Sequence, residues 1–153
     1  NLVILYINHG IKWFRLDAVG FIWKQSGTTC LHLSKAHLIV KVLRIKLSSL
    51  LSDGVLITET NVPQKENLSY LETEDEAHMA YNFPLPPLLL EAVVTSRADI
   101  LNTWIYNWPI LPENTTLFNF SASHDGIGLR PLEGLMEEER IKEERIILYQ
   151  SVS

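Results

Sequence analysis

Several features that mark particular classes of protein are scarce or missing in this sequence. A single cysteine, Cys30, leaves no internal disulfide, which fits a reducing compartment, so we expect a cytoplasmic protein. No apolar run reaches the roughly 18 residues of a membrane span. The net charge of -5 at pH 7 speaks against a nucleic-acid ligand. These absences argue against a disulfide scaffold, a membrane protein and a nucleic-acid binder.

What is present is a globular composition with alternating patterns. With 46% hydrophobic residues, the 153-residue chain can bury the core of one domain. Alternation and turn residues predict strands at 11–16, 55–60, 79–83 and 117–122, with helices ending near residue 9 and at 34–51, 88–106 and 132–150. Strands that alternate with helices predict an α/β fold with parallel pairing.

Polar residues stand where three of the expected strands end. Asp17, Glu59 and the pair His124-Asp125 each lie at or just beyond the C-terminal end of a different strand, and in a parallel α/β barrel active sites form at that edge. A set of carboxylates suits glycosyl transfer with retention, in which one attacks the anomeric carbon and a second acts as acid and then base. Arg15 lies on the same face as Asp17 and favours its ionised form. A structural salt bridge at a strand end is the simpler alternative for this pair.

Three segments carry a family resemblance. FRLDAVGF, ITETN and FNFSASHDGIG resemble signature segments of the α-amylase superfamily, glycoside hydrolase family 13, in the order of barrel strands four, five and seven. NFPLPPLLLEA and SHDGIGLRPLEG are most similar to the sucrose-phosphorylase subfamily, and ETNVPQKENLSYL resembles members that act on glucosylglycerate or glucosylglycerol.

The resemblance implies a role for each site residue. It makes Asp17 the nucleophile, Glu59 the general acid/base and Asp125 the stabiliser of the transition state, while Arg15 and His124 hold the donor glucosyl unit. It implies a (β/α)8 TIM barrel, with phosphate as co-substrate, a small carbohydrate as the other substrate and no cofactor.

Members of that superfamily are several times longer than this chain. We therefore expect residues 1–153 to form part of the catalytic barrel domain, about strands four to seven with their helices. The rest of the barrel and any accessory domains would lie outside it. A half-barrel exposes two sheet edges that a closed barrel lacks.

Other candidate residues have weaker signals. Histidines 32, 37 and 78 lack ligand spacing, so we expect surface or loop positions and no metal site. Trp13 and Trp104 lie in apolar patterns and are expected in the core, whereas Trp23, in the loop after Asp17, is a candidate for substrate stacking. Arg130 could bind phosphate or pair with Glu133, and both readings stay open.

The resulting hypothesis is a retaining glucosyl phosphorylase that transfers glucose from an α-glucoside to phosphate. The carboxylates serve hydrolysis equally well, because both reactions share the first step, so an α-glucosidase-type hydrolase is the alternative. A third possibility is a fragment that keeps the residues without a working pocket. The oligomeric state and the acceptor sugar or polyol are not predicted.

Overall fold

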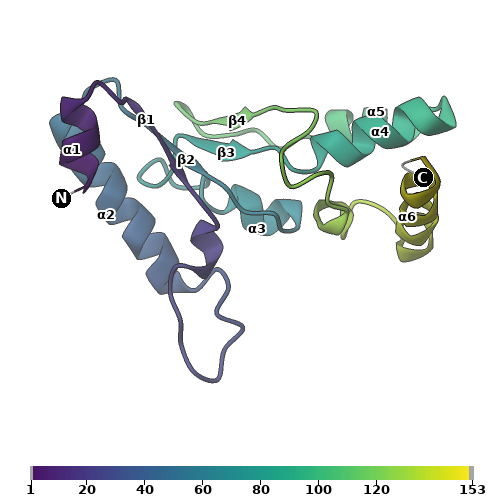
Figure 1. Cartoon of the computed structure of the whole chain (residues 1–153), viewed down its shortest axis with the longest axis horizontal. Helices are drawn as coiled ribbons and strands as arrows, with labels where there is room; N and C mark the ends of the chain where they lie inside the picture. Colours follow the sequence, from purple (N-terminus) through teal and green to yellow (C-terminus); the bar gives the residue numbers. More distant parts are fainter. Residues whose placement is uncertain (1, 152–153) are drawn as a thin grey trace. The chain divides into compact units, whose positions relative to one another are not determined.

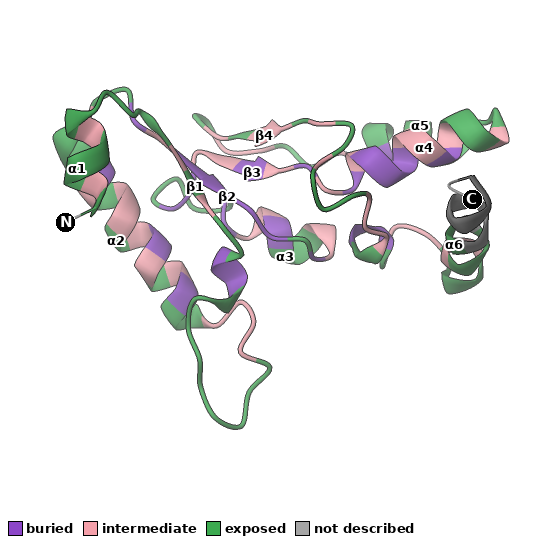
Figure 2. Ribbon diagram, in the orientation of Figure 1, coloured by how far each residue is buried: buried purple, intermediate pink, exposed green. Residues whose placement is uncertain are grey.

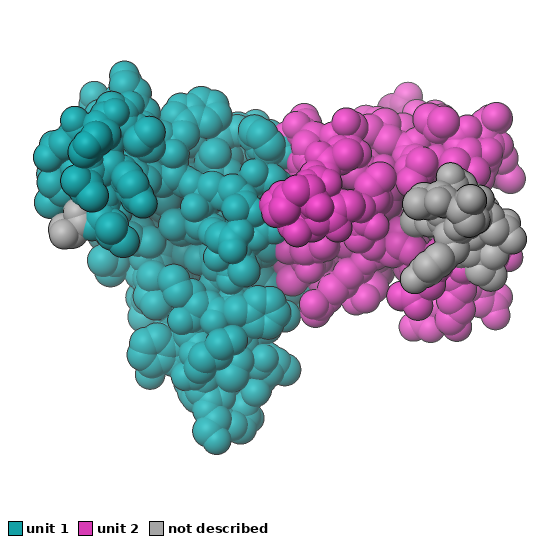
Figure 3. Space-filling view, viewed as in Figure 1, with its two compact units in different colours: residues 1–60, 66–81, 111–118 teal, residues 61–65, 82–110, 119–153 magenta. Residues whose placement is uncertain are grey.

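The chain divides into two compact units in a computed structural model (Figure 3). The structure describes residues 2–151, apart from the side chains of residues 144 and 146–151. Unit 1 comprises residues 1–60, 66–81 and 111–118, and unit 2 comprises residues 61–65, 82–110 and 119–153. Each unit is described by itself below.

Unit 1 is built on a parallel sheet in the order β1-β2-β3-β4 (Figure 1). Its strands are β1 (Trp13–Leu16), β2 (Val55–Thr58), β3 (Met79–Tyr81) and β4 (Thr116–Phe118). Helix α1 (Leu2–Asn8) precedes β1, and α2 (Ser34–Leu50) connects β1 to β2. Every strand is shorter than expected, but each lies within or beside its expected range, and all pairings are parallel. The prediction of an α/β fold with parallel strands is confirmed.

Helix α2 packs against the sheet through one narrow face. Ala36, Val40 and Leu47 are buried at helical spacing, and Val40 and Leu47 join Leu56 of β2 in the core. Burial of Val40, Leu47 and Leu56 contributes about 1.5 to 3 kcal/mol each. Gly54 permits the close approach at the start of β2, because a Cβ there would lie 2.8 Å from Cγ of Leu47. The α2–β2 contact therefore depends on the absence of a side chain at position 54.

The loops of unit 1 contain structure that the sequence pattern did not reveal. A 3-10 helix, η1 (Val19–Phe21), follows Asp17 directly and buries Val19. The expected loop at 61–76 includes a short helix, α3 (Gln64–Leu68), in which Asn67 is buried. The expectation of a core position for Trp13 was wrong: 56% of this residue is exposed, since it opens the edge strand β1.

Unit 2 contains helices packed around Leu88, Trp104 and Leu132. Figure 2 shows which segments of the chain are buried and which are exposed. The helix expected at 88–106 is two helices, α4 (Leu85–Thr95) and α5 (Asp99–Tyr106). Ser96 ends α4 in the left-handed conformation, with φ of 53°. Trp104 is buried as expected, and its Nε1 donates to Oε1 of Gln64 at 2.6 Å.

The last helix also begins later than its apolar pattern indicates. A 3-10 helix, η2 (Arg130–Leu132), is followed by Gly134 with φ of 80°, and α6 (Glu138–Ser151) starts only beyond it. A left-handed glycine cannot continue a helix, so the expected start at 132 was wrong. Within the described part of the chain, no helix combines the length and the apolar character that crossing a membrane would need.

Candidate active site

Asp17 and Glu59 occupy equivalent places on two neighbouring strands. Asp17 follows Leu16, the last residue of β1, and Glu59 follows Thr58, the last residue of β2. Leu16 and Thr58 are paired across the sheet, and the Glu59 N–H donates to the Leu16 carbonyl at 3.1 Å. The parallel register thus places both carboxylate-bearing residues at the same edge of the sheet.

Arg15 joins the two carboxylates through one guanidinium group. Its Nη1 donates to Oδ1 of Asp17 at 2.7 Å, and its Nη2 lies 3.7 Å from Oε2 of Glu59. Partial burial acts to lower the pKa of Arg15, but the negative charges of Glu59 and Asp17 and the Asp17 hydrogen bond raise it above its ordinary value. Arg15 therefore keeps its positive charge and lies beside the carboxylates of both Asp17 and Glu59.

The two carboxylates differ in their access to solvent. The side chain of Asp17 is 75% exposed, whereas that of Glu59 is 12% exposed. Glu59 is further held by the N–H of Ala18, which donates to its Oε2 at 2.8 Å. Ala18 adopts the left-handed conformation, with φ of 44°, which is rare for a residue with a side chain. An accessible carboxylate beside a buried, hydrogen-bonded one suits the separate roles of nucleophile and acid/base.

Tyr81, which the sequence reasoning missed, contacts Arg15 through its ring. The Arg15 guanidinium carbon lies 5.4 Å from the centre of its ring, and the ring of Phe118 lies 4.9 Å away on the next strand. Such a cation–π contact fixes the direction of the guanidinium. The position of Tyr81 in the sequence was the available signal. Tyr81 is the last residue of β3, just as Leu16 and Thr58 are the last residues of β1 and β2.

Asn82 is a second residue that the sequence reasoning missed, this time in unit 2. It directly follows β3, is buried, and donates from Nδ2 to Oδ1 of Asn119 at 2.8 Å. Its own Oδ1 is enclosed and has no hydrogen-bond partner in the described structure. Its position one residue beyond a strand was the available signal, the same signal that marked Asp17 and Glu59.

His124 and Asp125 lie together in a tight turn of unit 2. Nε2 of His124 is 3.3 Å from Oδ1 of Asp125, and both side chains are exposed. The Asp125 N–H donates to Oγ of Ser123, and Gly126 closes the turn with φ of 77°. The described contacts therefore join Arg15, Asp17 and Glu59 within unit 1, and His124 and Asp125 within unit 2.

The two remaining substrate candidates have different surroundings. Trp23 is 36% exposed, and Nζ of Lys35 lies 4.6 Å from the centre of its ring. Arg130 is exposed and borders a hollow of about 470 Å³ together with Glu133 and Arg145. Two arginines and one glutamate line the hollow, and the resulting net positive charge suits an anionic group.

Histidines 32 and 78 lie in loops, as expected, whereas His37 lies on α2. Each is half-buried, and each makes a hydrogen bond to a partner far away in the sequence. Burial lowers the pKa of His78 to about 4, with a smaller contribution from the positive charge of Arg44. No sequence spacing signals these contacts, because their partners lie on other elements.

No protein-family model matches the chain. Among curated proteins, it is 50% identical over 144 residues to the glucosylglycerate phosphorylase of Escherichia coli, which covers 94% of this chain and 26% of that protein. The glucosylglycerate phosphorylase of Allomeiothermus silvanus is 46% identical over 91% of this chain and 25% of its own length. A trehalose synthase of Thermus thermophilus is 32% identical over 92% of this chain and 14% of its own length.

A solved structure shows the same fold. The crystal structure of sucrose 6F-phosphate phosphorylase from Thermoanaerobacter thermosaccharolyticum superposes with a TM-score of 0.75 and 26% sequence identity, over 90% of this chain and 26% of that one. The chain thus spans about a quarter of the length of the phosphorylases it matches. Its parallel sheet and helices match part of a phosphorylase TIM barrel, and the resemblance to the sucrose-phosphorylase group is confirmed.

Proposed function

We propose that this chain supplies catalytic residues of a retaining glucosyl phosphorylase whose donor is glucosylglycerate. One observation carries the proposal: a single guanidinium, that of Arg15, contacts two carboxylates at the ends of adjacent parallel strands. Glucosylglycerate is proposed as the donor because the chain is 40 to 50% identical to proteins named glucosylglycerate phosphorylase. Sucrose and glucosylglycerol are the related donors to compare.

The proposed reaction proceeds by two displacements at the anomeric carbon. A carboxylate oxygen of Asp17 forms a bond to this carbon as the bond to the glycerate oxygen breaks, and Glu59 gives its proton to that oxygen. A phosphate oxygen then displaces Asp17, the Glu59 carboxylate takes a proton from the phosphate, and α-glucose 1-phosphate is released. Two inversions give net retention.

Arg15 has two tasks in this scheme. It orients Asp17 for attack, since the hydrogen bond at 2.7 Å fixes one carboxylate oxygen and leaves the other free. It also balances the charge of Glu59 after this residue has lost its proton. We assign His124 to the glucosyl ring and Asp125 to the positive charge that develops in the transition state, by the same resemblance. Trp23 and Arg130 are proposed contacts of the substrate and phosphate.

Hydrolysis is the second candidate, and a specific similarity favours it. A relative named trehalose synthase/amylase from Mycolicibacterium smegmatis is 30% identical over 92% of this chain. The same segment therefore occurs in a protein whose name includes amylase activity. The acceptor of the glucosyl group, phosphate or water, distinguishes the two candidates.

The test is a graft into the Escherichia coli phosphorylase, in which this chain replaces the 144-residue segment it matches. Glucose 1-phosphate and free glucose are measured from glucosylglycerate, sucrose and glucosylglycerol, with and without phosphate. Phosphate-dependent release of glucose 1-phosphate supports the proposal, whereas phosphate-independent release of glucose favours the hydrolase. A graft that melts like its parent but turns over no donor contradicts both and supports the inactive fragment. The Asp17→Asn graft is the matched control for background activity.

A further inference from the structure

The backbone that follows Asp17 is held in an unusual conformation. Ala18 and His32 both adopt the left-handed conformation, with φ of 44° and 50°. Residues with side chains rarely adopt it unless their surroundings enforce it, and such residues gather at functional sites. Between them lies η1 (Val19–Phe21), and the His32 N–H donates to the Gly20 carbonyl at 2.9 Å.

Gly20 and His32 are also packed too closely to move independently. A Cβ on Gly20 would lie 2.9 Å from Cε1 of His32 and 3.1 Å from Cδ1 of Leu31. The His32 ring therefore forms the surface against which the turn after Asp17 rests. Any displacement of this ring changes the space available to Gly20, and with it the path of the chain from Asp17 onward.

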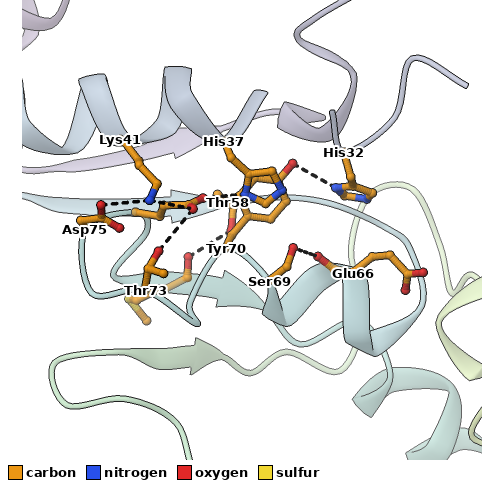
Figure 4. A network of polar contacts seen from close by, with 11 residues as sticks. His32, His37, Lys41, Thr58, Glu66, Ser69, Tyr70, Thr73 and Asp75 are labelled. Atoms are coloured by element: carbon orange, nitrogen blue, oxygen red, sulfur yellow. Dashed lines mark hydrogen bonds and ion pairs between the residues drawn. The ribbon is translucent and has the colours of Figure 1, made fainter. Parts of the chain in front are cut away.

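A buried tyrosine fixes the His32 ring in turn (Figure 4). The Tyr70 hydroxyl is hydrogen bonded to Nδ1 of His32 at 2.9 Å, and Tyr70 is fully buried. Burial and the negative charge of Glu76 raise the pKa of Tyr70, so its hydroxyl keeps its proton. His37 stacks on the Tyr70 ring at 4.3 Å and is paired with the buried Glu76 at 2.8 Å. The tyrosine is thus held on its ring face and by its hydroxyl.

We propose that His32, held by Tyr70, is a positioning residue for the candidate nucleophile Asp17 and for the Ala18 N–H that binds Glu59. The proposal rests on the proposed function. In the described contacts, His32 touches neither carboxylate. It acts through its contact with Gly20 in η1, and Asp17 and Ala18 directly precede this 3-10 helix. The chain of contacts runs from Glu76 through His37, Tyr70 and His32 to the turn, entirely within unit 1.

The variants separate the side chain of His32 from its backbone conformation. His32→Gly tolerates the left-handed conformation but removes the bond to Tyr70, whereas His32→Asn tolerates it and keeps an acceptor near the position of Nδ1. Tyr70→Phe removes the hydroxyl and keeps the ring that stacks on His37. Tyr106→Phe, at an 88% exposed tyrosine, is the matched control.

Kinetics in the grafted phosphorylase give the first readout. A displacement of about 1 Å costs on the order of a hundredfold in rate, so we expect kcat to fall at least about tenfold in His32→Gly and Tyr70→Phe, with KM within about twofold. The double variant falls no further than His32→Gly alone, because Tyr70→Phe removes a bond that His32→Gly has already removed. His32→Asn restores kcat to within about threefold of the parent graft, a rescue that general loss of stability would not allow. Unchanged kcat in Tyr70→Phe overturns the proposal.

Hydrogen exchange in the grafted phosphorylase gives a readout that needs no activity. The amides of Phe21, Ile22 and His32 are hydrogen bonded to the backbone of the turn, so they should exchange faster in Tyr70→Phe while those of α2 do not. Unchanged exchange of the three amides overturns the positioning role even if the graft is active. If the graft is inactive with every donor, the proposed function fails, and faster exchange would still establish that Tyr70 holds the turn.

Discussion

Arg15 offers the sharpest test of the site, because its loss should affect both carboxylates at once. Its bond to Asp17 is short but reaches a 75% exposed side chain, and its 3.7 Å contact reaches a Glu59 side chain that is 12% exposed. Exposed pairs contribute roughly 0.2 to 1 kcal/mol, and hydrogen bonds to charged groups about 1.5 to 3 kcal/mol. Removing both contacts should thus cost about 2 to 3 kcal/mol in the transition state.

That loss corresponds to a fall of about 30- to 150-fold in kcat/KM for Arg15→Met in the grafted phosphorylase. Arg15→Lys keeps the charge but cannot span both carboxylates with one planar fork, so we expect a smaller loss. Arg97→Met is the matched control: Arg97 also pairs with an aspartate two residues on, Asp99, at 3.2 Å, but on the exposed start of α5. A change below about threefold for Arg15→Met would refute the reasoning, as would an equal loss for Arg97→Met.

Three further predictions concern catalysis, stability and association. In the graft, Asp17→Asn should lose at least about a thousandfold in kcat on every donor, whereas Glu59→Gln should regain activity on donors with good leaving groups; equal losses on all donors would contradict the roles. His78 has a pKa of about 4 in the folded chain and 6.5 when unfolded, so the unfolded state binds the extra proton between these values. The free energy of unfolding should therefore fall by about 1 to 2 kcal/mol, after allowance for solvent screening, as pH drops from 6.5 to 4, and His78→Gln should flatten this dependence in urea titrations. The isolated chain should associate in light scattering and turn over little donor, because Trp13, Leu38, Val42 and Ile45 are exposed; an active, monodisperse monomer would contradict this.

Local patterns predicted the strands and the places of Asp17 and Glu59, because a strand end is a short-range feature. The same reasoning missed the break at Ser96, because polar residues such as Thr95, Ser96 and Arg97 also occur within amphipathic helices, and it is the left-handed backbone that reveals the break. It also missed the contact between Tyr70 and His32, because these residues are 38 positions apart in the sequence and no local pattern links them. The prediction of a core position for Trp13 was wrong for a different reason. An apolar pattern shows that a face can be buried, but it does not show whether another segment covers that face.

The hydrogen bond from Ala18 to Glu59 has a consequence for folding kinetics. It joins residues 41 positions apart, across a crossover that includes all of α2. Parallel pairing of this kind requires closure of a long loop before any contact compensates for the lost chain entropy, which makes it slow relative to helix formation. Helix α2 should therefore be in place before the two carboxylates meet, and the nucleophile and its acid/base partner should be among the last features of this βαβ unit to acquire native geometry. Folding intermediates that already contain the helix would then still lack the site.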